Sequence, residues 1–222
     1  MRLIDLSHVL EPGMPVYPGL PAPIFTTVFT HDESSSRGYV PGTTFQIAAL
    51  TLCGNTGTYI DAPFHRHREK ADLAGLRLEQ LANLPGVLVD ASGWNERGIG
   101  PTIFAGRDVA GKAVLIRTDW SRRWGSPHYW EPGPFLTTEG ARWLAKHGAT
   151  LVGIDSWNID DTADATRPAH TILLDADIVI CEHLCGLDQL PASGFRFSAV
   201  APRIVGGTSF PVRAYAVVDG LA

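Results

Sequence analysis

TTEGARWLAKHGATLVGIDS, residues 137–156, is the stretch that decides the fold class of this chain. Its threonine pair can cap a helix, in which Ala141, Leu144 and Ala145 recur on one face. Gly148 ends that helix, and the apolar run after it is typical of a strand covered on both sides. A helix that leads directly into a buried strand is an α/β unit. The sequence therefore predicts an α/β fold.

Most other apolar segments are short and rich in β-branched and aromatic residues, which predicts strands. A second helix is expected only at Leu73–Leu84, and His31–Gly42 is expected to be a polar loop. That is too few helices for a strictly alternating nucleotide-binding fold. We therefore expect a strand-rich single domain over residues 1–222, with a mixed sheet and few helices. The other predicted strands are Pro23–Thr30, Thr44–Leu52, Gly86–Ser92, Ala113–Trp120, Asp177–Leu184 and Val212–Val218.

The overall composition argues against several classes of protein. The 222 residues carry a net charge of −5 without a basic patch, so nucleic acid is not expected as a partner. No segment approaches the roughly 20 apolar residues of a membrane span. Nucleotide-binding and serine-hydrolase motifs are missing. The odd number of cysteines, Cys53, Cys181 and Cys185, favours a reducing compartment. We expect a cytoplasmic protein.

The first candidate site is GNTGTYIDAPFHRH, residues 54–67. If YIDAP is extended, Tyr59 and Asp61 face the same side, because strand side chains repeat every two residues. His65 could project into the same cavity as Asp61, where a carboxylate would orient the imidazole for acid–base chemistry. The alternative is a polar turn with a surface histidine, and these residues alone do not decide between the two.

The second candidate site is ATRPAHTILLDADIVICEHL, residues 165–184. His170 is expected in a turn after Pro168, and Glu182 at the end of a buried strand. A carboxylate there is costly unless it is paired or bound to a metal, which favours a functional role over a strand end that reaches solvent. His183, the next residue, should point to the opposite face of the strand.

A further acidic segment, GIDSWNIDD, follows the predicted strand at residues 150–156. Asp160 and Asp161 are interpreted as turn formers, since aspartate is common in turns. Asp155 stands at the end of a buried strand, where sites often gather. The sequence does not decide between a structural and a functional role for it.

Five ordered segments, over nearly the full length, resemble the cyclase family of metal-dependent hydrolases that includes bacterial kynurenine formamidase. NTGTYIDAPFH is similar to the family signature H-x-G-T-H-x-D-x-P-x-H, and RPAHTILLDADIVICEHL is similar to its second metal-binding segment. The other three are IDLSHVLEPGMPVYPG, GARWLAKHGATLVGIDSWNID and GFRFSAVAPRIVGGTSFPVRAYAV. The resemblance implies a swivelling β/β/α domain assembled as a homodimer or homotetramer. It also implies hydrolysis of amides such as N-formylkynurenine or isatin with one or two Zn²⁺ or Mn²⁺ ions.

When the family's site residues are matched one by one to this chain, two of them differ. Asn55 and Tyr59 stand where the family has metal-binding histidines. An amide oxygen and a neutral phenol are poor ligands for zinc. We therefore expect at most one divalent metal ion per subunit, Zn²⁺ or Mn²⁺, or none. The matching residues are the acid–base histidine His65 and the metal ligands Asp61, His170 and Glu182.

Two functions remain open on this basis. In the first, the protein is an arylformamidase-like hydrolase of a small amide or cyclic amide. The metal activates water, His65 shuttles a proton, and Asn55 and Tyr59 donate hydrogen bonds to the developing oxyanion. In the second, there is no metal. The pocket then binds a small molecule, or catalyses a lactonase, cyclase or dehydratase-type reaction through His65, Asp61 and Tyr59.

The substrate is expected to be a small molecule, and aromatic side chains are available to surround it. Pockets for such molecules are mostly apolar with few polar anchors. The same side chains could equally belong to the core or to a subunit interface, and the segment DWSRRWGSPHYWEPGPF could cover the site or reach a neighbouring subunit. The aromatic residues are Trp120, Trp124, Tyr129, Trp130 and Trp157.

Overall fold

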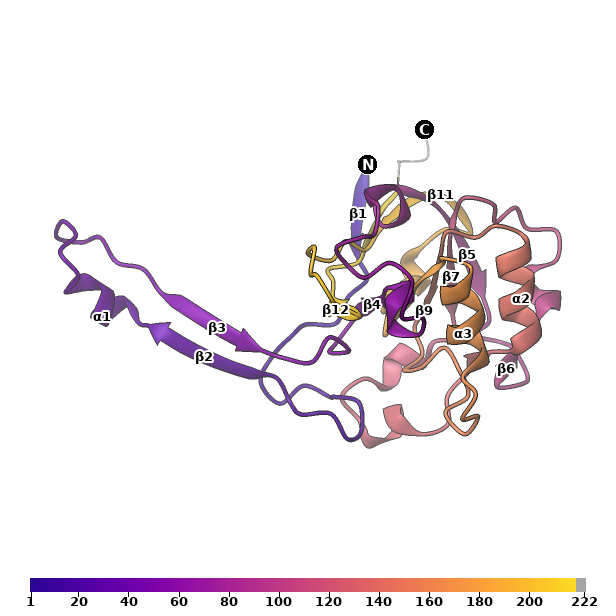
Figure 1. Cartoon of the computed structure of the whole chain (residues 1–222), viewed down its shortest axis with the longest axis horizontal. Helices are drawn as coiled ribbons and strands as arrows, with labels where there is room; N and C mark the ends of the chain where they lie inside the picture. Colours follow the sequence, from indigo (N-terminus) through magenta and orange to yellow (C-terminus); the bar gives the residue numbers. More distant parts are fainter. Residues whose placement is uncertain (219–222) are drawn as a thin grey trace.

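A nine-stranded mixed sheet forms the body of the protein (Figure 1). The computed structural model describes residues 1–218. The four central strands run parallel, and the pairs on either side of them are antiparallel. The predicted α/β class, with a strand-rich mixed sheet, is therefore confirmed. In spatial order the strands are β1 (Arg2–Asp5), β13 (Tyr215–Val218), β11 (Ser193–Ser198), β5 (Leu84–Asp90), β7 (Ala113–Arg117), β9 (Leu151–Ile154), β10 (Val179–Glu182), β4 (Tyr59–Asp61) and β12 (Ser209–Pro211).

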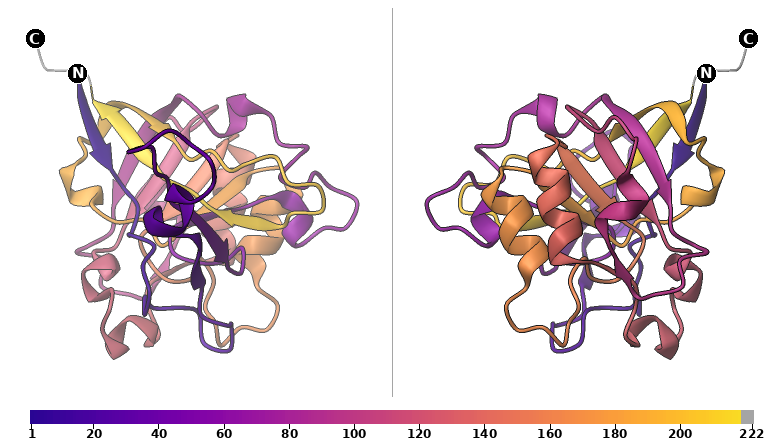
Figure 2. Two further views of the ribbon diagram at one scale, coloured as in Figure 1. Left: turned by 90° about the vertical axis from the view of Figure 1, so that its left-hand side faces the viewer. Right: turned by 90° about the vertical axis from the view of Figure 1, so that its right-hand side faces the viewer.

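The central strands consist of apolar runs whose side chains are buried on both faces of the sheet. Along β7, Val114 and Ile116 pack into one core, and Ala113 and Leu115 pack into the other. Helices α2 (Thr138–Lys146) and α3 (Pro168–Asp175) lie side by side over the first of these faces (Figure 2, right). Continuous apolar runs thus form strands covered on both sides, as their composition predicts.

Helix α2 begins and ends close to the predicted positions. The Thr137 side chain accepts a hydrogen bond from the backbone N–H of Gly140, and Ala141 and Leu144 are buried. The predicted helix at Leu73–Leu84 is wrong. That segment contains only a short 3₁₀ helix, η2 (Leu78–Gln80), because the extended backbone of Arg77 interrupts the segment before it, and the positive φ of Asn83 turns the chain into β5 after it.

A two-stranded arm extends from the body and is joined to it only at its base (Figure 1). Its strands are β2 (Ile24–Phe29) and β3 (Ile47–Thr51), which pair antiparallel. The predicted polar loop at its tip contains the short helix α1 (His31–Ser35), whose capping box is formed by Thr30 and Glu33.

The remaining elements are short and connect the strands of the body. Strands β6 (Gly98–Ile99) and β8 (Phe135–Leu136) form a small parallel pair. No helix within residues 1–218 is long and apolar enough to cross a membrane. The other 3₁₀ helices are η1 (Pro63–His65), η3 (Pro101–Phe104), η4 (Trp120–Arg123), η5 (Pro127–Trp130) and η6 (Leu187–Gln189).

Candidate metal centre and active site

Asp61 lies at the end of β4, which pairs with β10 on one side and with β12 on the other. Tyr59 and Asp61 are both buried and, two residues apart on one strand, share a face, as expected. Oδ1 of Asp61 accepts hydrogen bonds from the Ser209 hydroxyl of β12 and from the Asn55 amide, which lies 3.3 Å away. Ser209 was not among the expected site residues, because only strand pairing brings it to a segment so distant in sequence.

His170 lies in the first turn of α3, not in the irregular turn expected from Pro168. Proline is well tolerated in the first turn of a helix, which explains how the segment forms one. Its ring Nδ1 lies 2.6 Å from Oδ2 of Asp160. Asp160 also accepts hydrogen bonds from the backbone N–H groups of Ala169 and His170. Asp160 is therefore more than a turn former, because it caps the helix and orients the histidine ring.

Glu182 is the last residue of β10 and is fully buried, so it does not reach solvent. Its Oε1 accepts a hydrogen bond of 2.6 Å from the backbone N–H of Ile159, and its Oε2 accepts one from the Tyr59 hydroxyl. Each oxygen of the buried carboxylate thus accepts a hydrogen bond. These bonds offset part of the free-energy cost of burying a charged group.

Asp61, His170 and Glu182 converge on one point. Nε2 of His170 lies 3.7 Å from Oδ2 of Asp61 and 3.8 Å from Oε1 of Glu182. Asp61 Oδ2 is buried without a hydrogen-bond partner among the described residues. These separations suit ligand atoms that each lie about 2.0–2.2 Å from a shared ion. The residues therefore fit a divalent metal, which would give the orphaned oxygen its partner.

The electrostatics of this cluster also fit a cation. Burial alone would lower the pKa of His170, but the charge of Glu182, the hydrogen bond to Asp160 and the charge of Asp61 raise it to about 10. Burial, together with the charge of Asp61, raises the pKa of Glu182. Three buried carboxylates around one imidazole leave an excess of negative charge, which a divalent cation would offset.

His65 lies at the edge of this cluster and is partly exposed to solvent. Its Nδ1 is 3.3 Å from the Ser209 hydroxyl and 3.8 Å from Oδ1 of Asp61. His65 therefore lies beside Asp61. A hollow of about 590 Å³ opens beside the cluster and is lined by Tyr17, Leu20, Asn55, Tyr59, His65, Asn158 and Arg167. His65 lines this hollow, whereas the fully buried Asp61 does not.

Asn55 and Tyr59 both contact the carboxylates of the cluster. The Tyr59 hydroxyl donates to Glu182, and the Asn55 amide lies within hydrogen-bond distance of Asp61 and Ser209. The two residues at the positions of the expected histidines therefore hold the carboxylates of Asp61 and Glu182 in place.

The aromatic residues of the 120–130 segment pack around His183 behind the cluster. His183 adopts a positive φ just after the end of β10, so the alternation of strand side chains, on which the expected opposite face rested, does not apply to it. Its Nδ1 lies 2.9 Å from the Tyr129 hydroxyl, and burial lowers the pKa of its ring to about 3. Tyr17, which lines the hollow, packs against Trp130 and Trp157. The aromatic cluster thus supports one wall of the hollow.

Asp155 has a structural role in the region behind the site. Its carboxylate accepts hydrogen bonds from the backbone N–H groups of Thr118 and Asp119 and from the Thr118 hydroxyl. It therefore fixes the turn after β7 rather than facing the hollow.

Comparison with known proteins places this geometry in a family. The model of the Cyclase family matches residues 4–161. The chain belongs to the cyclase family. It is 30% identical over 221 residues to the kynurenine formamidase of Erythrobacter litoralis, covering 96% of this chain and 92% of that protein. It is also 30% identical to the kynurenine formamidase of Salinibacter ruber, covering 96% of each chain.

Two solved structures share the fold of this chain. Isatin hydrolase A from Labrenzia aggregata, bound to benzyl benzoate, has a TM-score of 0.85 at 28% identity, covering 98% of this chain and 93% of its own. A structure described as a predicted metal-dependent hydrolase from Bacillus stearothermophilus has a TM-score of 0.77 at 29% identity, covering 97% of each chain.

Proposed function

We propose that this cyclase-family protein hydrolyses a small amide or cyclic amide, as an arylformamidase-like enzyme with one divalent metal ion. The observation that carries the proposal is the convergence of Asp61, His170 and Glu182 on a point where the buried Oδ2 of Asp61 has no partner. The similarity to kynurenine formamidases and to isatin hydrolase A, which act on amide bonds, supports the reaction class.

The metal would be held by three protein ligands and oriented by their neighbours. Zn²⁺ or Mn²⁺ bound by Asp61, His170 and Glu182 would polarise the amide carbonyl and lower the pKa of a coordinated water. Asp160 fixes the His170 ring so that Nε2 faces the site. Ser209 and Tyr59 each hold one oxygen of a ligand carboxylate in place.

His65 is the residue placed to move the proton. Its ring lines the hollow, and its Nδ1 reaches Asp61 and Ser209, so the other ring nitrogen can deliver a proton to the leaving nitrogen of the amide. Asn55 has two N–H groups, and one of them can donate to the developing oxyanion while the other contacts Asp61. Tyr59 has a single hydroxyl hydrogen, which it donates to Glu182, so an oxyanion contact from Tyr59 requires that bond to open.

Replacement of His65 tests this assignment. We expect His65→Ala to abolish hydrolysis of formanilides and isatin-like cyclic amides without unfolding the protein, because the leaving nitrogen then lacks its acid. His67→Ala is the matched control, since His67 bonds to the Thr171 carbonyl and does not line the hollow. Wild-type turnover in His65→Ala would refute the role. If a metal-free wild-type protein turns over a lactone, the metal-independent alternative replaces this proposal.

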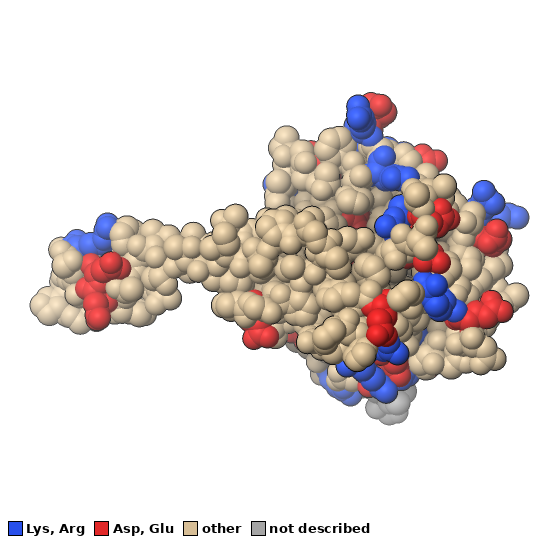
Figure 3. Space-filling model, turned by 90° about the horizontal axis from the view of Figure 1, so that it is seen from below, with Lys and Arg blue, Asp and Glu red and all other residues tan. Residues whose placement is uncertain are grey.

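We also propose that the arm pairs two copies of this chain into a homo-oligomer. Its stem, residues 24–30 and 43–52, contains no charged residue, and Figure 3 shows charges only toward the tip. An isolated two-stranded hairpin is marginally stable in water, and both of its edges offer unpaired backbone groups. The number of residues in the arm, from Ile24 to Thr51, falls within the roughly 20–30 residues that each partner contributes to a standard protein–protein interface.

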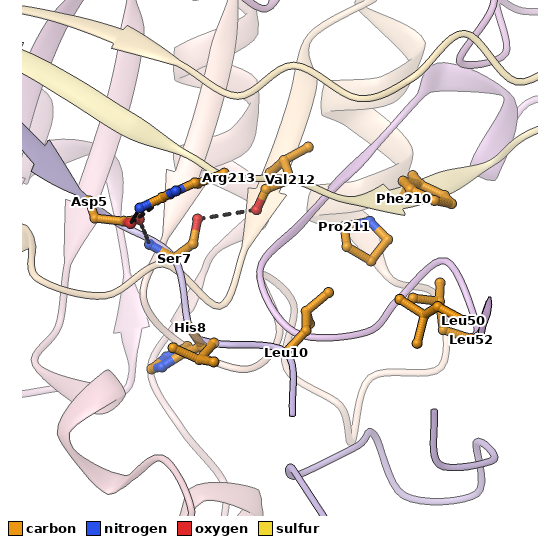
Figure 4. A pocket seen from close by; sticks show the side chains of 11 residues that line it. Asp5, Ser7, His8, Leu10, Leu50, Leu52, Phe210, Pro211, Val212 and Arg213 are labelled. Atoms are coloured by element: carbon orange, nitrogen blue, oxygen red, sulfur yellow. Dashed lines mark hydrogen bonds and ion pairs between the residues drawn. The ribbon is translucent and has the colours of Figure 1, made fainter. Parts of the chain in front are cut away.

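An apolar hollow at the base of the arm is the proposed receptor for the partner's arm. It measures about 830 Å³ and is lined by Leu10, Leu50, Leu52 and Phe210, among others (Figure 4). Because each chain carries both the arm and the hollow, two chains related by a two-fold axis could each place their arm in the other's hollow. We further propose that the sheet with its two helices is the swivelling β/β/α domain implied by the sequence resemblance.

A further inference from the structure

Arg167 immediately precedes α3 and lines the same hollow as His65 and Tyr59. We propose that Arg167 binds a carboxylate carried by the substrate, so that the preferred substrates of this site are acidic amides. This inference rests on the proposed amide hydrolysis and adds the charge of the substrate to it.

Arg167 forms no ion pair within residues 1–218, although its charge adds to the hydrogen bonds of Thr166 in lowering the pKa of the nearby Asp164 carboxyl. No aspartate or glutamate oxygen of that range lies within 4.0 Å of its guanidinium nitrogens. Its recorded side-chain hydrogen bond is a long one of 3.4 Å, from Nη1 to the Asp161 carbonyl. The Asp161 carboxylate pairs instead with Arg97, and the exposed Asp164 accepts hydrogen bonds from Thr166. A guanidinium has five N–H donors, so most of those of Arg167 are free for a ligand.

The rest of the lining favours an anion of a particular shape. No acid lines the hollow, since two asparagines, two tyrosines, His65 and one leucine lie beside the arginine. Tyr17 and Leu20 supply an apolar wall. A ligand with an aromatic or aliphatic body could therefore place its amide near His65 and its carboxylate against Arg167. The planar fork of an arginine matches a carboxylate with two parallel hydrogen bonds.

The backbone conformation of Arg167 would suit glycine or asparagine better than arginine, which indicates that this position is occupied by arginine for its side chain. Its φ of 49° and ψ of 59° lie in the left-handed region, where glycine and asparagine are the favoured residues. The loop is also anchored from outside, because Arg66 donates to the Thr166 carbonyl and to the Thr171 hydroxyl. The guanidinium of Arg167 is therefore presented from a fixed loop.

Binding of benzoate and benzamide, which have the same shape but differ in charge, tests the inference without turnover. By calorimetry on the metal-loaded protein, we expect benzoate to bind at least tenfold more tightly than benzamide. Arg167→Gln should abolish that preference, and Arg167→Lys, which keeps the charge but loses the fork, should retain part of it. Arg68→Gln removes an exposed arginine that does not line the hollow, and the preference should survive it. Equal binding of the two compounds, binding of neither, or a preference that survives Arg167→Gln overturns the inference.

Turnover of two formanilides, one with a ring carboxylate next to the formamide and one without, separates this inference from the proposed function. We expect the acidic compound to have the higher kcat/KM, and Arg167→Gln to reduce the ratio of the two values at least tenfold. If neither compound is hydrolysed but benzoate binding depends on Arg167, the hydrolase proposal fails while the anion site stands. If both are hydrolysed with a ratio that Arg167→Gln does not change, the hydrolase stands and the anion site fails.

Discussion

At the residue scale, the candidate site consists of a few proposed ligand residues and the neighbours that hold them. The sequence could name Asp61, His65, His170 and Glu182 as candidates, because their types and order follow a signature and a buried carboxylate needs a partner, and the structure brings the four together. The sequence indicates only a turn former at Asp160 and gives no sign that Ser209 belongs to the site. No local sequence pattern marks either residue. Asp160 contacts His170 only because α3 packs beside it, and Ser209 contacts Asp61 only because β12 pairs with β4.

Asp160 provides a direct residue-scale prediction. Asp160→Asn removes the negative charge that holds Nδ1 of His170, so we expect affinity for Zn²⁺ to fall about 10- to 100-fold, as for other residues that orient a metal ligand. The measurement is a competition titration against a chelator. Asp161→Asn, one residue further on and paired with Arg97 near the surface, is the control and should leave the affinity within about twofold of wild type. An unchanged affinity in Asp160→Asn would argue that His170 needs no such support.

His8 gives a prediction on stability and pH. Burial lowers the pKa of His8 to about 4, and its ring stacks on Trp124 at 3.9 Å between centroids. The unfolded chain therefore binds a proton below pH 6.5 that the folded chain resists, so stability falls as the pH drops from 6.5 towards 4. His8→Phe keeps the stacking and has no proton to bind. Between pH 7 and pH 5 the wild type should lose about 2 kcal/mol more than His8→Phe in urea unfolding. Parallel losses in the two proteins would contradict the assignment.

At the element scale, local signals predicted α2 well and the segments at residues 73–84 and 168–175 badly. Helix α2 has a cap, one apolar face and a terminal glycine, which all agree. The leucines of 73–84 have helical spacing, but Leu73 and Leu81 are buried in the core from a largely irregular chain. Helix α3 starts at Pro168 and is capped by Asp160 from a separate turn, so its cap could not be read from the adjoining sequence.

The cap of α2 can be tested with two neighbouring threonines. The Thr137 side chain accepts from the N–H of Gly140, whereas Thr138 is the first helical residue and caps nothing. Thr137→Ala should lower the free energy of unfolding by about 1 kcal/mol, and Thr138→Ala should change it by less than about half of that. Urea denaturation measures both values. Equal effects would mean that the cap does not stabilise the helix.

At the scale of the whole molecule, the strand-rich mixed sheet was predictable, but the arm was not. Its two strands were expected as strands from their composition, yet nothing in the sequence shows that they pair only with each other and leave the body. What separates them from the body strands is their exposure, since β2 and β3 contain no buried residue.

The arm makes a prediction about assembly. Ile24 and Val28 are two exposed apolar residues of β2. Charging both in Ile24→Lys/Val28→Lys should shift a wild-type dimer or tetramer towards the monomer in light scattering after gel filtration. Leu78→Lys, which charges an exposed leucine on the body, should leave the oligomer intact. A monomeric wild type would refute the proposed role of the arm.

The metal content of the purified protein tests the central claim most directly. Elemental analysis after purification without chelators, followed by addition of Zn²⁺ or Mn²⁺ and removal of the excess, should give one divalent ion per subunit. His170→Ala, which removes the only nitrogen ligand of the cluster, should lose that ion. Wild-type protein that retains no ion after the addition, or His170→Ala that binds as much as the wild type, would contradict the account.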